Sequence, residues 1–277
     1  MAMRRTLEKP VPPSDPPVQW CEAGGHRLSY SIEGDAEAPV VILVHGIPGS
    51  VADFRYLAPV LMPKFRVIRM EFPGFGSNRT VPTTNYPSSP EARADLIIAC
   101  ADALGIDRWT MLGHSMGGPP AMCAAARAPD RVTALGLIAS LGLRRHRGMV
   151  VPPWAMKLGL AALRVPGLSQ LLVKTSRRAY ARLGFAKGAA QLTRTDLEVH
   201  GQIIGAIKFS QLQQVPAQVR CPVWVIAAVD DRLVEPEIPR ELSEQFAHAT
   251  LKMFPSGGHN IQKSRARAIA ELITRTA

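Results

Sequence analysis

Gly113-His114-Ser115-Met116-Gly117 is the most informative stretch of this sequence, and it directly follows the apolar run Trp109-Thr110-Met111-Leu112. The run predicts a buried strand, and the alanine-rich segment 121–126 predicts a helix. A strand that turns at once into a helix leaves Ser115 on a tight corner with its hydroxyl exposed. Glycine is needed two residues before and two residues after the serine, because a side chain there would collide with the neighbouring backbone. The pattern predicts that Ser115 is a nucleophile.

The length and composition of the chain fit one α/β domain with an insertion, because 277 residues that are 47% hydrophobic can bury a large core. The four cysteines are far apart in the sequence, without a C-x-x-C pair or a metal-ligand spacing, so we interpret them as reduced thiols of a cytoplasmic protein. No apolar run follows Arg4-Arg5, and the longest uncharged stretch, 109–126, is broken by Pro119-Pro120. We therefore expect neither a signal peptide nor a membrane-spanning helix.

Strand-like and helix-like segments alternate along the chain. The predicted strands are 18–21 and 27–32 (a hairpin turned at Gly24-Gly25), 40–44, 65–72, 109–112, 132–139, 223–228 and 250–254. The predicted helices run from Ser50 to about Leu61, from Ser89 to about Leu104 and from the turn after Ser115 to about Arg127. Two more are predicted over about 237–247 and about 264–274. This alternation predicts an α/β fold with a mostly parallel sheet wrapped by helices. Ligands of such sheets bind at the carboxyl ends of the strands, where Ser115 falls.

A serine hydroxyl needs a base that takes its proton and a carboxylate that orients that base. In this architecture the order along the chain is serine, acid, histidine. Asp230 and Asp231 both follow the strand 223–228, and His259 follows the last strand on the loop Gly257-Gly258. The sequence therefore predicts a triad of Ser115, one of these two aspartates and His259.

The chain resembles the α/β-hydrolase family over nearly its whole length. His45-Gly46-Ile47-Pro48-Gly49 is similar to the family's H-G-x-P-G loop, and 72–77 is similar to its D-x-P-G-x-G-x-S turn, with Glu71 near the usual aspartate. The resemblance implies that the N–H groups of Ile47 and Met116 form the oxyanion hole. In the family's G-x-x-D pattern the acid lies three residues after a glycine; Ala228 replaces that glycine here, and the spacing indicates Asp231 rather than Asp230.

The resemblance also implies a mobile cap between the sixth strand and the strand before the acid. We expect a Pro-rich tail over 1–17, a core over 18–142 and 219–277, and a helical cap over 143–218. The predicted cap helices are 154–164, 168–183 and a third that begins at a Thr195–Glu198 capping box and ends near Lys208. The apolar residues 149–154 at the entry to the cap are expected to face the pocket, with Trp154 contacting an apolar substrate.

The positive charge is concentrated in the cap. Residues 144–208 hold twelve Lys or Arg and two acidic residues, a net charge of +10 out of +11 for the chain. The twelve are Arg144, Arg145, Arg147, Lys157, Arg164, Lys174, Arg177, Arg178, Arg182, Lys187, Arg194 and Lys208. This is either a solvated basic face or an amphipathic surface that meets an anionic membrane or acidic substrates. Aromatic residues are sparse among these charges, which disfavours nucleic acid as a partner.

These features together predict a serine hydrolase that cleaves a carboxylic ester, like a carboxylesterase or lipase, without a metal or an organic cofactor. Within the family, C–C bond hydrolases, thioesterases and haloperoxidase-like enzymes use similar triads and stay open as alternatives. Epoxide hydrolases and haloalkane dehalogenases carry aspartate at the position of Ser115, and proline iminopeptidases carry tryptophan at the position of Met116. These differences disfavour all three classes. The alternative of another class is a non-catalytic ligand-binding or membrane-associated member, which would not need an aligned base.

The remaining histidines are given structural roles. His45 and His114 flank the predicted site and are expected to orient loops rather than to transfer protons. His200 and His248 follow no strand end and carry no predicted function, and His26 and His146 are expected at the surface.

Overall fold

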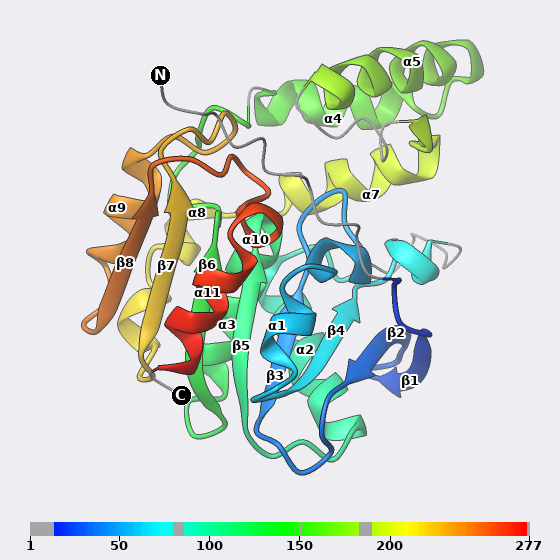
Figure 1. Ribbon diagram of the computed structural model, residues 1–277. Helices are drawn as coiled ribbons and strands as arrows, with labels where there is room; N and C mark the ends of the chain where they lie inside the picture. The colour runs from blue at the N-terminus through cyan, green and yellow to red at the C-terminus, as the bar shows by residue number, and fades with distance from the viewer. Residues whose placement is uncertain (1–13, 80–85, 150, 183–189, 276–277) are drawn as a thin grey trace, which may run out of the picture.

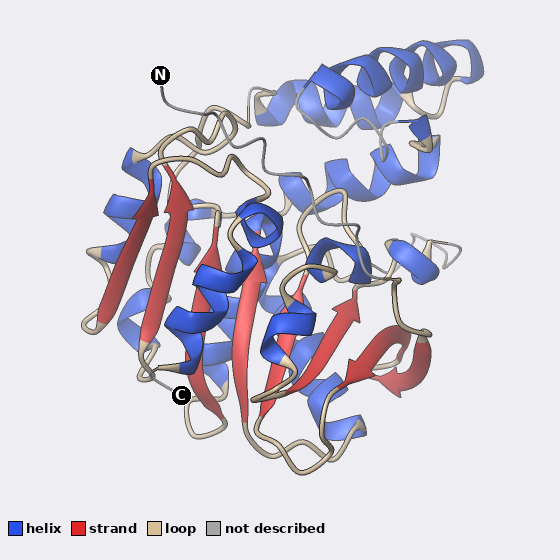
Figure 2. Ribbon diagram, viewed as in Figure 1, coloured by secondary structure: helices blue, strands red, loops and turns tan. Residues whose placement is uncertain are grey.

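A single sheet forms the centre of the molecule (Figures 1 and 2). The computed structural model describes residues 14–79, 86–149, 151–182 and 190–275, and in this part of the chain eight strands pair in the order β1-β2-β4-β3-β5-β6-β7-β8. The strands are β1 (Gln19–Ala23), β2 (His26–Glu33), β3 (Val40–Val44), β4 (Arg66–Glu71), β5 (Trp109–His114), β6 (Val132–Ile138), β7 (Val223–Ala228) and β8 (Ala249–Phe254). From β4 to β8 all neighbours are parallel, while β2 is antiparallel to both β1 and β4. The predicted α/β class is confirmed.

Helices cover both faces of the sheet. The longer ones are α2 (Pro90–Ala103), α3 (Gly118–Arg127), α4 (Pro153–Ala162), α5 (Pro166–Arg182), α7 (Arg194–Gly205), α9 (Glu237–Ser243) and α11 (Ala266–Thr274). The shorter ones are α1 (Ala58–Leu61), α8 (Phe209–Leu212) and α10 (Ile261–Ser264), with the 3₁₀ turns η1 (Val51–Phe54), η2 (Gly76–Asn78), η4 (Ser115–Gly117) and η5 (Pro216–Gln218). In Figure 1, α1, α10 and α11 lie in front of the sheet and α2 and α3 behind it.

The sheet separates two apolar cores. Side chains of β3 alternate between them: Ile42 and Val44 pack with α2 and α3, whereas Val41 and Leu43 pack with α1 and α11. Because both faces of the sheet are buried, its central strands read as continuous apolar runs rather than as alternating ones. This burial fixes the strand ends, and with them the loops at the carboxyl edge of the sheet.

The prediction of one continuous helix from Ser50 to Leu61 is wrong, because the structure has two separate elements there. Ser50 does act as a cap, since its hydroxyl accepts from Ala52 N–H at 3.2 Å, but it caps only the turn η1. A separate helix, α1, begins at Ala58 and carries Pro59 in its first turn. Proline has no N–H to donate to the preceding turn, so it can begin a helix but interrupts one that is already running.

The chain between β6 and β7 contains three helices, α4, α5 and α7, which lie above the carboxyl edge of the sheet (Figure 1). The third begins two residues earlier than predicted. Thr193, not Thr195, accepts from Asp196 N–H, and the Asp196 carboxylate accepts from Thr193 N–H at 2.6 Å. Glu198 instead pairs with Arg194 at 2.9 Å. The helix ends at Gly205, and α8 follows separately.

Several expected features lie wholly or partly outside the described residues, namely the first 13 residues of the Pro-rich tail, Val150 and Lys187. None of the helices that the structure describes combines the length and apolar character needed to cross a bilayer. All four cysteines are free thiols, although the sulfurs of Cys21 and Cys100 lie 3.8 Å apart.

Candidate active site

The turn after β5 holds Ser115 in a strained backbone conformation. Its φ is +52°, a left-handed value that residues with a side chain rarely adopt. Side chains at the two flanking glycines would have no room: a Cβ at Gly113 would lie 2.5 Å from Gly117 O, and a Cβ at Gly117 would lie 2.6 Å from His45 O. These contacts are the physical reason for the G-x-S-x-G pattern.

Ser115, His259 and Asp231 form a continuous chain of hydrogen bonds. Ser115 Oγ lies 2.7 Å from His259 Nε2, and His259 Nδ1 lies 2.8 Å from Asp231 Oδ2. Because a carboxylate can only accept, Nδ1–H donates to Asp231, and the neutral ring then accepts from the Ser115 hydroxyl through Nε2. The three residues come from the loops after β5, β7 and β8, at one edge of the sheet.

Asp231 is almost fully buried and is held in its charged form. Its second oxygen, Oδ1, accepts from Leu233 N–H at 2.8 Å and from Val234 N–H at 3.1 Å. Burial by itself would raise the pKa of Asp231, but the hydrogen bond from His259 and these two backbone donors outweigh it and hold the pKa below its ordinary value. The carboxylate therefore stays ionised and fixes the orientation of His259.

Asp230 has a different task. Its Oδ1 accepts from Gly257 N–H at 2.9 Å and from Gly258 N–H at 2.8 Å. The exposed side chain of Asp230 thus ties the glycine loop that carries His259 to the loop that carries Asp231. Asp230 therefore holds the backbone of the loop, while Asp231 holds the imidazole.

His114 and His45 hold backbone from positions just outside this chain of hydrogen bonds. His114 Nε2 lies 3.1 Å from the carbonyl of His259, and burial together with the neighbouring His259 keeps the pKa of His114 well below its usual value. His45 Nδ1 donates to Gly46 O at 2.7 Å while Nε2 accepts from Phe72 N–H at 3.3 Å. Burial lowers the pKa of His45 to about 4, so the ring is neutral and links the loop after β3 to the end of β4.

Glu71 organises the turn that follows β4. Its carboxylate accepts from Val51 N–H at 3.0 Å, from Ser77 N–H at 2.8 Å and from the Ser29 hydroxyl at 2.7 Å. A Cβ at Gly76 would lie 1.9 Å from this carboxylate, so the turn closes on it only with glycine at that position. Glu71 therefore fixes the two loops that flank the cavity next to Ser115.

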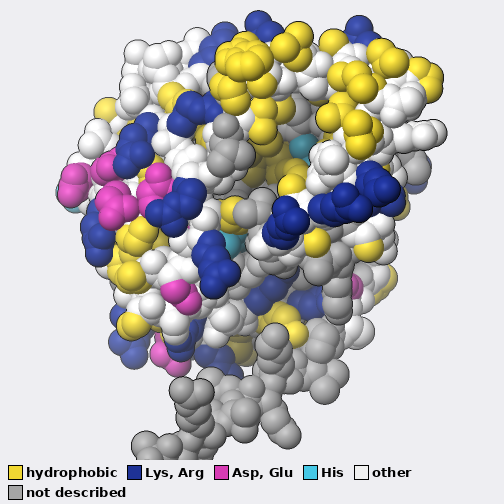
Figure 3. All heavy atoms as spheres, turned by 90° about the horizontal axis from the view of Figure 1, so that it is seen from above, with side chains coloured by type: hydrophobic (Ala, Val, Ile, Leu, Met, Phe, Trp, Pro, Cys, Tyr) yellow, Lys and Arg dark blue, Asp and Glu magenta, His cyan; other side chains and the backbone are white. Residues whose placement is uncertain are grey.

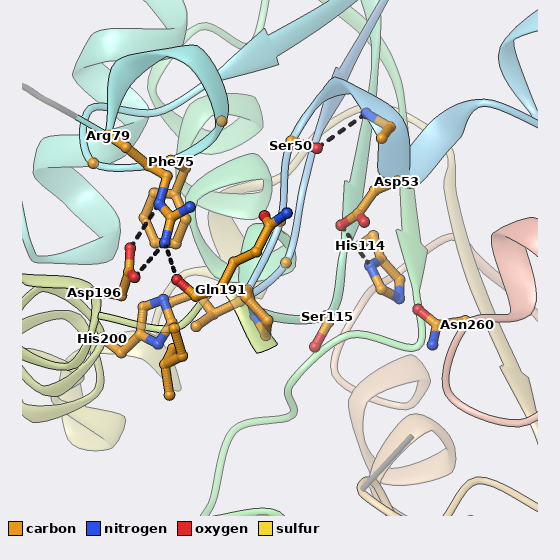
Figure 4. Close-up of a pocket in the computed structure, with 18 of the residues that line it drawn as sticks. Ser50, Asp53, Phe75, Arg79, His114, Ser115, Gln191, Asp196, His200 and Asn260 are labelled. Carbon is orange, nitrogen blue, oxygen red and sulfur yellow. Dashed lines mark hydrogen bonds and ion pairs between the residues drawn. The ribbon is translucent and has the colours of Figure 1, made fainter. Parts of the chain in front are cut away.

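A cavity of about 780 Å³ opens beside Ser115, within the size range of small-molecule sites (Figure 4). It is lined by Gly46, Ile47, Pro48, Gly49, Ser50, Ala52, Asp53, Arg55, Tyr56, Gly74, Phe75, Gly76, Arg79, His114, Ser115, Gln191, Leu192, Asp196, His200, His259, Asn260 and Lys263. In Figure 4, Phe75, Arg79, Asp196 and His200 lie on one side and His114 and Asn260 on the other. The lining combines apolar, charged and imidazole groups.

The structure places the two residues expected as oxyanion donors differently, since Ile47 lines the cavity whereas Met116 is buried and is absent from its lining. Ile47 lines the cavity on the loop after β3, and Met116 stands in the first turn of η4, directly after Ser115. The first N–H groups of a helical turn have no partner within the turn and point toward an incoming negative charge. Their role as oxyanion donors stays a prediction.

The cap is tied to the core beside the cavity. Arg79, in the segment after η2, donates through Nε to Asp196 at 3.0 Å and through Nη2 to Gln191 O at 2.8 Å. The hydrogen bonds from Arg79 and Thr193 lower the pKa of Asp196 against the opposing effect of burial. No motif signalled Arg79, because its partner lies 117 residues away in the sequence.

His200 is the clearest residue that sequence reasoning missed. It lines the cavity from α7, its Nδ1 lies 3.0 Å from the Tyr180 hydroxyl, and its ring stacks on Phe75 with centroids 5.5 Å apart. Burial lowers its pKa to about 4, so the ring is neutral at physiological pH. The only available signal was its spacing of four residues from Asp196 on one helix face.

Two side chains lie where the sequence did not place them. Trp154 is 67% exposed and is absent from the cavity lining, because the first turn of α4 turns it to the outside. Met149 and Val151, which were expected to face the pocket with it, do not line the cavity either. His146 is buried rather than on the surface: its Nδ1 lies 2.9 Å from Leu233 O, since the segment after β6 folds over the loop that carries Asp231. Among the described residues, no group of three or more His, Cys, Asp or Glu side chains is arranged to hold a metal ion.

Comparison with known families settles the fold and the superfamily. The model of the alpha/beta hydrolase fold matches residues 39–266, which include the turn at Ser115 and both loops that carry its partners. The chain belongs to the α/β-hydrolase fold family. This membership confirms the resemblance drawn from the sequence motifs and the α/β fold expected from it.

The individual relatives of this α/β hydrolase are distant. It is 29% identical to the magnesium-chelatase 30 kDa subunit of Rhodobacter capsulatus, over 87% of each chain. It is 24% identical to the sn-1-specific diacylglycerol lipase ABHD11 of Mus musculus, over 89% of this chain and 84% of the lipase. Among solved structures, the enol-lactonase from Burkholderia xenovorans LB400 superposes with a TM-score of 0.75 at 20% identity, covering 93% of this chain and 99% of the lactonase.

Proposed function

We propose that this α/β hydrolase is a serine esterase that cleaves a carboxylic ester through an acyl-enzyme. The observation that carries the proposal is the position of His259, 2.7 Å from Ser115 Oγ and 2.8 Å from Asp231 Oδ2. An imidazole so placed takes the proton of Ser115 as the hydroxyl attacks, and the adjacent carboxylate stabilises the imidazolium that forms.

The reaction balances with these groups alone. Ser115 Oγ forms a bond to the carbonyl carbon, and the negatively charged carbonyl oxygen accepts hydrogen bonds from the N–H groups of Ile47 and Met116. The ester C–O bond then breaks, and the leaving alcohol takes the proton from His259. Water, activated by the same imidazole, hydrolyses the acyl-enzyme and releases the carboxylic acid.

The lining of the cavity supports an ester. The names of the relatives do not choose the bond, since one of matching length is named a diacylglycerol lipase, another a carbamate hydrolase and a third a 2-hydroxy-6-oxononadienedioate hydrolase. The apolar side chains of Ile47, Phe75 and Leu192 line the cavity and offer a surface for an acyl group. A non-catalytic receptor would need neither the strained Ser115 nor a base aligned with it.

A panel of substrates with different scissile bonds tests this proposal. We expect p-nitrophenyl esters with apolar acyl chains to be hydrolysed, and Ser115→Ala to lower turnover by several orders of magnitude. The same preparation is offered an acyl thioester, a vinylogous diketone and peroxide with halide. Inert esters together with cleavage of the diketone would transfer the assignment to a C–C hydrolase, and inertness toward every substrate would support the non-catalytic alternative.

A further inference from the structure

Large apolar side chains are exposed on α4, on α5 and in the turn between them. Those that are at least 46% exposed are Trp154, Leu158, Val165, Leu168 and Leu171. Trp154 and Leu158 are four residues apart on α4, and Leu168 and Leu171 are three apart on α5, so each pair shares one side of its helix. Contiguous exposed patches of large apolar side chains are uncommon on monomeric soluble proteins and mark sites of interaction. We call these five residues the apolar ridge.

Basic side chains accompany the ridge. Lys157, Arg164, Lys174, Arg178 and Arg182 are all exposed, and Lys174, Arg178 and Arg182 continue the face of α5 that Leu171 begins. No acidic residue occurs between Asp130 and Asp196 in the sequence, so nothing on α4 or α5 neutralises these charges. Seen from above, hydrophobic side chains gather along one edge of the molecule, with Lys and Arg side chains beside them (Figure 3).

The charge decides which partner fits the ridge. A second copy of this chain would bring two strongly positive surfaces together, and like charges that meet in an interface repel each other. An anionic lipid surface offers both complements at once, since its headgroups attract Lys and Arg and its acyl boundary receives Trp and Leu. We propose that the α4–α5 face, made of the apolar ridge and these five basic residues, docks onto an anionic lipid surface.

Docking would occur next to the catalytic cavity without using it. Both α4 and α5 pack on α7, which carries Asp196 and His200 into the cavity wall. The residues of the docking face are separate from the cavity lining. Membrane binding can therefore be measured with Ser115→Ala, so that its outcome does not depend on the proposed esterase activity.

Vesicle co-sedimentation tests the proposal. The full chain is mixed with vesicles of phosphatidylcholine alone or with phosphatidylglycerol added, and Trp154 reports insertion through its fluorescence. We expect binding to the anionic vesicles with a blue shift that Trp154→Phe abolishes. The binding should fade as salt rises, because the screening length falls from about 30 Å at 0.01 M to about 3 Å at 1 M.

Two sets of variants separate the charges from the apolar side chains. Lys174→Gln, Arg178→Gln and Arg182→Gln together should weaken partitioning about a hundredfold, since each cation near the surface contributes roughly fivefold. Leu158→Ser, Val165→Ser and Leu168→Ser together should remove the binding that persists at high salt. All six side chains are exposed, so circular dichroism should show the folded protein in each case.

A matched control removes the same charge from the opposite edge of the sheet. Lys64, Arg108 and Arg220 are exposed and precede β4, β5 and β7 at their amino ends. Their replacement by Gln should leave vesicle binding within about twofold of the wild type, because charges beyond the screening length contribute little. Equal binding to neutral vesicles, an equal loss in the control, or self-association of the chain without vesicle binding would each overturn the proposal.

Discussion

The adjacent aspartates after β7 divide two tasks between them. Asp231 contacts the imidazole of His259, whereas Asp230 accepts from the N–H groups of Gly257 and Gly258. Both aspartates follow the strand, and the family's G-x-x-D spacing indicated Asp231 although Ala228 replaces the usual glycine. The structure brings Asp231 to His259 because its other oxygen is held by Leu233 and Val234 N–H, which turns the carboxylate inward.

Substitution by asparagine distinguishes these tasks. Asp231→Asn keeps the shape but offers His259 an amide, which mis-sets the tautomer, so kcat should fall by a factor on the order of 10⁴. Asp230→Asn keeps an oxygen that accepts from the two glycines, so kcat should change by less than about tenfold. Steady-state hydrolysis of a p-nitrophenyl ester measures both. A large loss in Asp230→Asn beside a mild one in Asp231→Asn would contradict the assignment of the acid.

At the scale of elements, the strands were predictable and the helix boundaries less so. The strands are buried on both faces, so their continuous apolar runs are visible in the sequence, and the meeting of residues at their carboxyl ends follows from the parallel order of the sheet. Helix α7 shows where this fails. Thr193-Arg194-Thr195-Asp196-Leu197-Glu198 contains two overlapping capping patterns, and the contact of Asp196 with Arg79 favours the first.

Two residues of the cavity wall could not be predicted from the sequence either. His200 and Arg79 meet their partners through tertiary contacts that leave no local pattern. Trp154 was expected in the pocket because it ends the apolar run 149–154, yet the structure turns it outward on the apolar ridge. Its exposure is explained if the ridge has a partner of its own, which is the proposal that the vesicle experiment addresses.

At the scale of the whole molecule, buried histidines should make the fold sensitive to acid. Burial lowers the pKa of His45 and His200 from the ordinary 6.5 to about 4. Between pH 6.5 and pH 4 the unfolded chain binds protons at these rings and the folded chain does not. The stability that the neutral rings contribute is therefore complete above pH 6.5 and is lost as the pH falls toward 4. Each ring should cost about 2 kcal/mol of unfolding free energy by pH 5.

Urea unfolding at pH 7.5 and pH 5 measures this loss. The free energy of unfolding of the wild type should fall over this interval, and His200→Asn should lose about 2 kcal/mol less, because asparagine does not titrate and the variant lacks one of the buried imidazoles. An exposed histidine serves as the control: His248→Asn should fall as much as the wild type. Equal stability of the wild type at both pH values would contradict the account of these buried rings.

The central claim is that Ser115 is a nucleophile activated by His259, and covalent labelling with a fluorophosphonate tests it most directly. Phosphorus is attacked quickly only by an activated hydroxyl, so intact mass should show one added group per chain, and peptide mapping should place it on Ser115. Labelling should be absent in Ser115→Ala and much slower in Asp231→Asn. A label on another residue, persistence in Ser115→Ala, or an unlabelled wild type would contradict the claim.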